Sequence, residues 1–339
     1  MVIGGIMAYD HKQALWSHMP YLSDTNVPQL AVSRAIPDAI KPHVVSQNLL
    51  FVDGCLTDSN LPIGIKVFGN KIVIENFTGS LAIKHINTVA VQAKIDLTIS
   101  DSKVAITEHI FGGPAIQKMD FNWQIINNSQ VMHSQHAVGA AGVLMINSNI
   151  EQKAATSYQA WRLCHSGNWL HEHTQIKLVG NQAVADIQGL LMAFEDNNCQ
   201  MSATFEHIGL NTRGKHDVTM LVDANARGVC YSDVLVGSNA SGTCTEQHNR
   251  NIALAATAEI FTQPRLCINN EQVECSHGAT TGDLDQNMLR YMQSRGMSDA
   301  MAEQLLIKGY ANAAVAGAPD ESWSELAFKK LTDIWSIKC

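Results

Sequence analysis

The stretch Ile95-Asp-Leu-Thr-Ile99, followed closely by Lys103-Val-Ala-Ile-Thr107, alternates apolar and polar residues and is rich in β-branched side chains. This is the pattern of short strands that bury one face. The same pattern returns at residues 71–75 and 217–222, with polar turn residues between the runs. The sequence therefore predicts a mainly β region over residues 48–281.

Two all-β architectures can hold so many short strands: a β-solenoid, whose coils stack along one axis, and a large sandwich of two sheets. Asn197, Asn211, Asn225 and Asn239 recur every 14 residues, as turn residues of stacked coils do. Charged residues make up only 16% of the chain. This favours a solenoid, because stacked turns bring like charges together whereas stacked amides can hydrogen-bond each other. The sandwich stays open as the alternative.

The regions on either side of the strands have a different texture. Residues 1–47 mix short helical patches with prolines and are expected to form a short N-terminal helical segment. Residues 282–339 are expected to form a C-terminal helical domain, in which Asp283 caps the first helix, Gly296 ends it and Ser298 caps the second. An apolar stripe at helical spacing follows, made of Trp323, Leu326, Leu331 and Trp335. We expect at least half of this stripe to be core.

The charge balance and the apolar runs exclude several classes of protein. Lys and Arg number 23 against 31 Asp and Glu, a net charge of −8, without the basic surplus of a nucleic-acid groove. The longest apolar run, residues 137–146, is too short to cross a bilayer, and the first residues show no secretory signal. We therefore expect a cytoplasmic protein with neither nucleic acid nor membrane as a partner. Its eight cysteines include no C-x-x-C pair and are expected to be reduced.

Two motifs suggest chemistry only weakly. Gly209-Leu-Asn-Thr-Arg-Gly-Lys215 approaches a phosphate-binding loop, but His216 stands where Ser or Thr is needed and a strand-like run follows. We expect no nucleotide site there. His171 and His173 would share one face of a strand and could form a metal pair, although an exposed polar strand face is the simpler interpretation.

The run Cys275-Ser-His277-Gly-Ala-Thr280 carries the most specific chemical signal. A thiol and an imidazole two residues apart lie on the same side of an extended strand. Both groups are ligands for iron or copper, and an imidazole can also exchange protons near neutral pH. A buried thiol beside a hydrogen-bonded histidine is the structural alternative, and the residues alone leave both interpretations open.

The block from residue 266 to 315, which contains this run, Ser294-Arg-Gly296 and the apolar helix after it, resembles the C-terminal signature of the SufB/SufD family. Members of this family are scaffolds of the sulfur-mobilisation (SUF) machinery for iron–sulfur cluster assembly. The likeness extends to Thr262-Gln-Pro-Arg-Leu266 and, more weakly, to Leu50-Phe-Val-Asp-Gly54. The resemblance implies a right-handed parallel β-helix flanked by N-terminal and C-terminal helical segments, and a scaffold subunit without catalytic turnover.

Two positions separate the branches of that family. Where SufB carries a cluster-building cysteine and a glutamate after the shared histidine, this chain has Asn249 and Gly278, so it resembles SufD. The resemblance implies a SufB-like scaffold partner and a SufC-like ABC-type ATPase, and it allows for a homodimer in isolation. It implies no stably bound cofactor. His277, and secondarily Cys275, would be transient ligands of iron or a nascent cluster at the partner interface.

Two other functions stay open on the residues alone. One is a metalloenzyme built on the Cys275/His277 pair or on the His171/His173 pair. The other is a β-solenoid that binds glycans or other ligands, with the Cys275/His277 pair in its site. In isolation, the metalloenzyme would hold metal tightly and stoichiometrically, the binding protein would take a ligand without metal, and the scaffold would hold little metal and show no activity.

Overall fold

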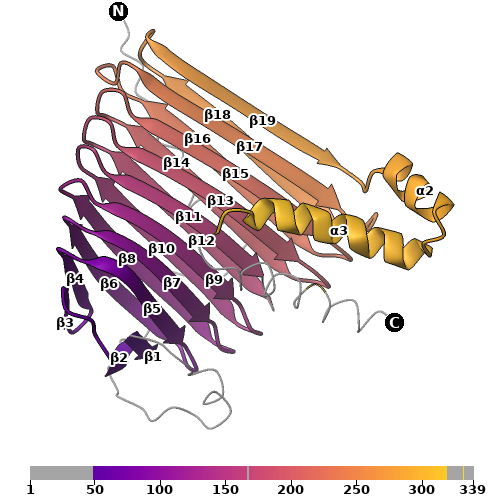
Figure 1. Cartoon of the computed structure of the whole chain (residues 1–339). Helices are drawn as coiled ribbons and strands as arrows, with labels where there is room; N and C mark the ends of the chain where they lie inside the picture. Colours follow the sequence, from indigo (N-terminus) through magenta and orange to yellow (C-terminus); the bar gives the residue numbers. More distant parts are fainter. Residues whose placement is uncertain (1–48, 166–167, 319–330, 332–339) are drawn as a thin grey trace, which may run out of the picture.

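The computed structural model describes residues 49–165, 168–318 and 331, and forms a parallel β-helix with two helices beside its C-terminal end (Figure 1). Successive strands alternate between two sheets, and from β4 onward every strand pairs in parallel with the next but one along the chain. The predicted parallel solenoid is confirmed and the sandwich is wrong. The predicted N-terminal helical segment, residues 1–47, lies outside the described residues.

The two sheets hold all the strands of the described chain. The first sheet contains, in spatial order, β19 (Val273–Gly282), β17 (Thr243–Ala253), β15 (Arg213–Val222), β13 (Val184–Ala193), β11 (Ser157–His165), β9 (Gln130–Val138), β7 (Lys103–Phe111), β5 (Thr78–Ile86), β1 (Leu49–Val52) and β2 (Cys55–Ser59). The second contains β18 (Glu259–Ile268), β16 (Arg227–Val236), β14 (Asn198–His207), β12 (Trp169–Leu178), β10 (Val143–Gln152), β8 (Ile116–Ile126), β6 (Val91–Ser100), β4 (Lys71–Glu75) and β3 (Ile65–Phe68).

One coil of the helix takes a little under thirty residues. Ser157 lies opposite Val184, and Val184 lies opposite Arg213, steps of 27 residues (157 to 184) and 29 residues (184 to 213). The 14-residue spacing of the four asparagines is therefore half a coil. All four lie in turns, two at each edge of the stack, which is the origin of the repeat that the sequence shows.

Alternation along each strand fills the interior of the coils. In β6, Ile95, Leu97 and Ile99 are buried while Asp96 and Thr98 between them are half-buried on the outer face. Each fully buried side chain of this kind contributes about 1.5–3 kcal/mol through the hydrophobic effect. The pattern read from the sequence is thus the one that separates the interior of the solenoid from its outer faces.

Some turns stack backbone against backbone. A Cβ atom on Gly180 would lie 1.9 Å from the Ala154 nitrogen, and one on Gly209 would lie 2.5 Å from the Gly180 oxygen. Only glycine permits so close an approach. Gly209 belongs to the run that approaches a phosphate-binding loop, and the chain leaves its turn into strand β15. A phosphate-binding loop leads into a helix instead, so the geometry agrees with the sequence in arguing against a nucleotide site.

Helices α2 (Gln286–Ser294) and α3 (Asp299–Val315) follow the last strand. Asp285, not Asp283, caps α2: one carboxylate oxygen accepts hydrogen bonds from the backbone N–H of Asn287 and Met288, at 2.8 and 3.2 Å. The chain is still extended at Asp285, so the helix starts two residues later than predicted. Gly296 adopts φ +89° after α2, and Ser298 caps α3, both as predicted. The described strands end at Gly282, while the domain division itself stays a prediction.

Helix α3 lies across the outer face of the first sheet (Figure 1). Its Ile307 and Val315 pack with Leu190 and Leu221 of the sheet, and Leu331 is buried in the same cluster. Leu331 is the one member of the predicted apolar stripe within the described residues, because Trp323, Leu326 and Trp335 lie outside them. None of the helices in the described part of the chain has the length and apolarity needed to cross a membrane.

Candidate functional site

Cys275 and His277 lie on β19, the terminal strand of the first sheet. Across the β17–β19 ladder, Thr245 pairs with Cys275 and Gln247 pairs with His277. Cys275 contacts the hydrophobic core that fills the coils, so positions 275 and 277 lie on the face of β19 that points toward the interior. The two side chains share one face, as the alternation predicts. Their role as metal ligands stays a prediction.

The exposure of this pair follows from its place at the end of the stack. Gln247, one coil deeper, is only 2% exposed, whereas His277 is exposed and Cys275 is half-buried. Burial, and after it the neighbouring Cys244 thiol, raise the pKa of Cys275. This thiol is therefore mostly protonated at neutral pH, and a metal ion must displace its proton in order to bind sulfur.

The inward face of β17 forms a polar floor beneath β19. Its inward positions hold Thr245, Gln247, Asn249 and Asn251, and all four side chains are buried. The Asn249 amide donates to the Thr262 hydroxyl at 2.6 Å, which links the two sheets across the interior of the last coil. One coil deeper, Val218 and Met220 of β15 occupy the inward positions opposite Asn249 and Asn251. The interior thus changes from apolar to polar just before the exposed pair.

His171 and His173 lie far from this site, on β12 of the second sheet. Both are half-buried on its outer face, with ring centroids 6.5 Å apart, and the His173 Nδ1 atom lies 2.9 Å from the Ser202 hydroxyl. Among the described residues, no group of three or more His, Cys, Asp or Glu side chains is placed to hold a metal ion. The structure does not bring the two pairs named from the sequence together.

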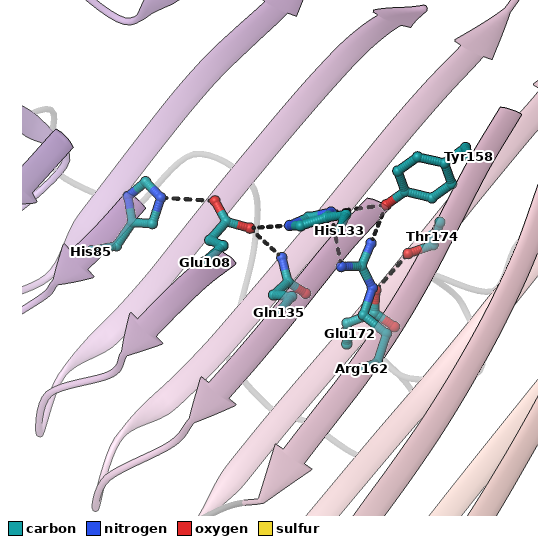
Figure 2. A network of polar contacts seen from close by, with 8 residues as sticks. All are labelled: His85, Glu108, His133, Gln135, Tyr158, Arg162, Glu172 and Thr174. Carbon is teal, nitrogen blue, oxygen red and sulfur yellow. Dashed lines mark hydrogen bonds and ion pairs between the residues drawn. The ribbon is translucent and has the colours of Figure 1, made fainter. Parts of the chain in front are cut away.

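A buried network of charged and polar side chains crosses the middle of the solenoid (Figure 2). The Glu108 carboxylate is its centre: His85 Nε2 lies 2.9 Å from one oxygen, and His133 Nε2 and Gln135 Nε2 lie 3.1 and 2.7 Å from the other. On the far side of His133, Nδ1 lies 2.9 Å from the Tyr158 hydroxyl. The chain of contacts then continues through Arg162.

Arg162 joins the two halves of this network. Its guanidinium donates to the Tyr158 hydroxyl at 2.7 Å, and its Nε lies 3.7 Å from a Glu172 oxygen that also accepts a 2.5 Å hydrogen bond from Thr174. Arg162, Glu172 and Glu108 are each about 1% exposed. Such a network has no contact with solvent or substrate, so its role is structural.

The hydrogen bonds fix the protonation states in the network. Burial, and after it the Arg162 charge, lower the pKa of His133 to about 4. Burial alone would raise the pKa of Glu108, but the hydrogen bonds from His133 and His85 outweigh it and hold that pKa well below its usual range. A neutral His133 that donates from Nε2 to ionised Glu108 and accepts at Nδ1 satisfies all these contacts.

Sequence reasoning missed the buried network and the polar floor. The signal that could have found the floor is the run Thr245, Gln247, Asn249, Asn251, in which every second residue of a strand-like stretch is an amide or a hydroxyl. For the network, the corresponding signal is a glutamate, a histidine and an arginine at inward phase in consecutive strands of one sheet, which requires the register to be known.

Comparison with known proteins places these features in context. The family described as "SUF system FeS cluster assembly, SufBD core domain" matches residues 88–310. The chain is 24% identical over 307 residues to the iron–sulfur cluster assembly protein SufD of Escherichia coli, covering 88% of this chain and 71% of that protein. It is 38% identical to a SufBD family protein of Synechocystis over 33% of this chain and 25% of that protein. A SufBD family protein of Pyrococcus horikoshii is 21% identical over 72% of this chain and 85% of its own length.

Proposed function

The chain belongs to the SufBD family of SUF iron–sulfur cluster assembly proteins, and from this premise we propose that it is the SufD-like subunit of an assembly complex. A scaffold role in that complex needs no catalytic turnover by this chain. A SufB-like partner completes with it the interface site where nascent clusters form, and a SufC-like ABC-type ATPase couples to the pair.

The observation that carries this proposal is the place of Cys275 and His277 on the inward face of a terminal strand. Strands β18 and β19 end their two sheets side by side (Figure 1). Terminal strands offer backbone donors and acceptors to a second chain. A partner whose strands continue both sheets would cover Cys275 and His277 and enclose them in the interface. The same edges would serve a homodimer of the isolated chain.

The chemistry of the two side chains fits iron as a transient cargo. A neutral imidazole nitrogen of His277 binds ferrous iron, and Cys275 adds a thiolate once its proton is displaced. Two protein donors leave the remaining positions of a tetrahedral iron to sulfide and to the partner. An incomplete ligand set of this kind favours release of the finished cluster over permanent retention.

Helices α2 and α3 supply the proposed contact with the ATPase. Four large apolar side chains on them are about half exposed or more: Met288, Tyr291, Met301 and Leu305. The opposite side of α3 packs on the sheet through Ile307 and Val315. A helical pair with one face anchored on the β-helix and apolar groups on the other supports a docking role.

Replacement of His277 in the assembled complex tests the proposal. Because His277 is exposed, His277→Ala should fold and assemble normally yet stop cluster build-up, followed by the visible absorption of the cluster. Cys275→Ser should slow it less. His248→Ala is the matched control, since His248 is an exposed histidine of the neighbouring strand, at a position of outward phase opposite Gly278. Normal cluster build-up in the His277→Ala complex would falsify the assignment.

A further inference from the structure

Gln247 is an anomaly in the polar floor. Its side chain is 2% exposed, and neither its amide nitrogen nor its amide oxygen has a hydrogen-bond partner among the described residues. Its neighbours on the same face are better satisfied, because the amide nitrogens of Asn249 and Asn251 donate to the hydroxyls of Thr262 and Thr281. A buried amide that leaves both its donor and its acceptor unpaired destabilises the fold. Such groups in native proteins call for an explanation.

The position of Gln247 supplies that explanation. It pairs in register with His277, and its neighbour Thr245 pairs with Cys275. Side chains at paired positions of adjacent strands project from the same face, with Cβ atoms about 5 Å apart. A glutamine side chain is long enough to reach a group held by the two residues above it. The unpaired amide therefore lies directly beneath the proposed cargo site.

We propose that Gln247 is the third residue of this chain that contacts the metal: its carboxamide oxygen binds the same divalent ion as Cys275 and His277. The inference rests on the proposed function in taking iron as the cargo. Sulfur, nitrogen and oxygen donors together suit mid-row divalent ions such as Fe²⁺ and its spectroscopic substitute Co²⁺. The amide nitrogen remains free to donate a hydrogen bond to sulfide or water on that ion.

The proposal makes stability and binding respond in opposite directions. Without metal, Gln247→Leu removes an unsatisfied buried amide and should raise the melting temperature of the chain by a few degrees. With metal, the same change removes an oxygen ligand. A purely structural glutamine would not combine a gain in stability with a loss of metal affinity.

Titration of the isolated full-length chain with Co²⁺ tests the inference, with the visible absorption of the bound ion as readout. We expect Gln247→Leu to weaken Co²⁺ binding about tenfold or more, and Gln247→Glu, which keeps the oxygen, to bind at least as tightly as the parent. Asn251→Leu is the matched control, because Asn251 is equally buried on the same face of β17 but pairs with Thr281, four residues beyond His277. Its Co²⁺ affinity should stay unchanged.

The outcomes separate this inference from the proposed function. Equal Co²⁺ affinity in the parent and Gln247→Leu overturns it, as does a parent chain that takes up no Co²⁺. If Gln247→Leu does not fold, Gln247→Glu decides alone: binding weaker than in the parent rules out an oxygen ligand. Cluster build-up that depends on His277 while Co²⁺ affinity ignores Gln247 would leave the proposed function standing and remove only the third contact.

Discussion

Arg162 is the residue on which the buried network depends most. It is 1% exposed and is the cation that faces Glu172, while its guanidinium also donates to Tyr158. Removing one partner of a buried ion pair leaves an uncompensated buried group, which is far more costly than losing a surface pair. The free energy of the pair therefore shows itself only when one half is removed.

We expect Arg162→Met to lower the free energy of unfolding by about 3–5 kcal/mol, measured by urea denaturation. Combining it with Glu172→Gln should recover a substantial part, because the unpaired carboxylate is then gone. Lys94→Met is the control: Lys94 pairs with Asp96 at the surface, with side chains 67% and 49% exposed, and its loss should change stability by less than about 1 kcal/mol. Equal effects of Arg162→Met and Lys94→Met would contradict this interpretation of the network.

At the scale of the element, β19 is the strand whose environment should change most when a partner binds. It pairs with β17 on one side and ends its sheet on the other. The backbone N–H groups that face away from β17 should exchange with solvent quickly in the isolated chain. Strand β13, which pairs with β11 and β15, serves as the protected reference.

Hydrogen–deuterium exchange measured by mass spectrometry checks this expectation. Adding a SufB-like partner should slow exchange in peptides from β19 and leave those from β13 unchanged, because strand addition supplies the missing hydrogen bonds. Slow exchange in β19 of a monomeric isolated chain would mean that its edge is already covered. Unchanged exchange in a formed complex would place the interface elsewhere.

The same elements show what sequence patterns can predict. Alternation over residues 95–107 predicts strands with one buried face, and the 14-residue spacing of asparagines predicts stacked turns, because both are local consequences of the coil. The strand run containing His133 and Gln135 is polar at both phases, so its pattern does not reveal which side chains face inward. The unpaired state of Gln247 likewise depends on residues about thirty positions away, and only the folded coil shows it.

For the whole molecule, the buried histidines set the response to acid. Burial lowers the pKa of His133, His207 and His216 to about 4 each from an ordinary value near 6.5, with the Arg162 charge contributing at His133. Between these values the unfolded chain binds protons that the folded chain does not. Stability is therefore lost as pH falls from 6.5 toward 4, and Glu108, whose folded pKa is lowered, adds to the loss below its usual range.

Three such groups give a slope of up to about 4 kcal/mol per pH unit in that window. Urea denaturation at a series of pH values from neutral to 4.5 should show stability falling throughout. His216→Gln should reduce the slope by about a third, since it removes one of the three protons. An identical slope in the parent and the variant would mean that His216 is not neutral in the folded chain.

The step of 27 to 29 residues between paired strands also governs the order in which the protein can be made. Each rung needs only the rung synthesised just before it, so a chain emerging from the ribosome can add one coil at a time. The strand bearing Cys275 and His277 is the last rung to emerge, and it has no template until β17 is in place. A truncated or stalled translation product therefore never displays the pair in its working geometry. Vectorial growth of the stack thus acts as quality control, because only a fully translated scaffold can receive iron.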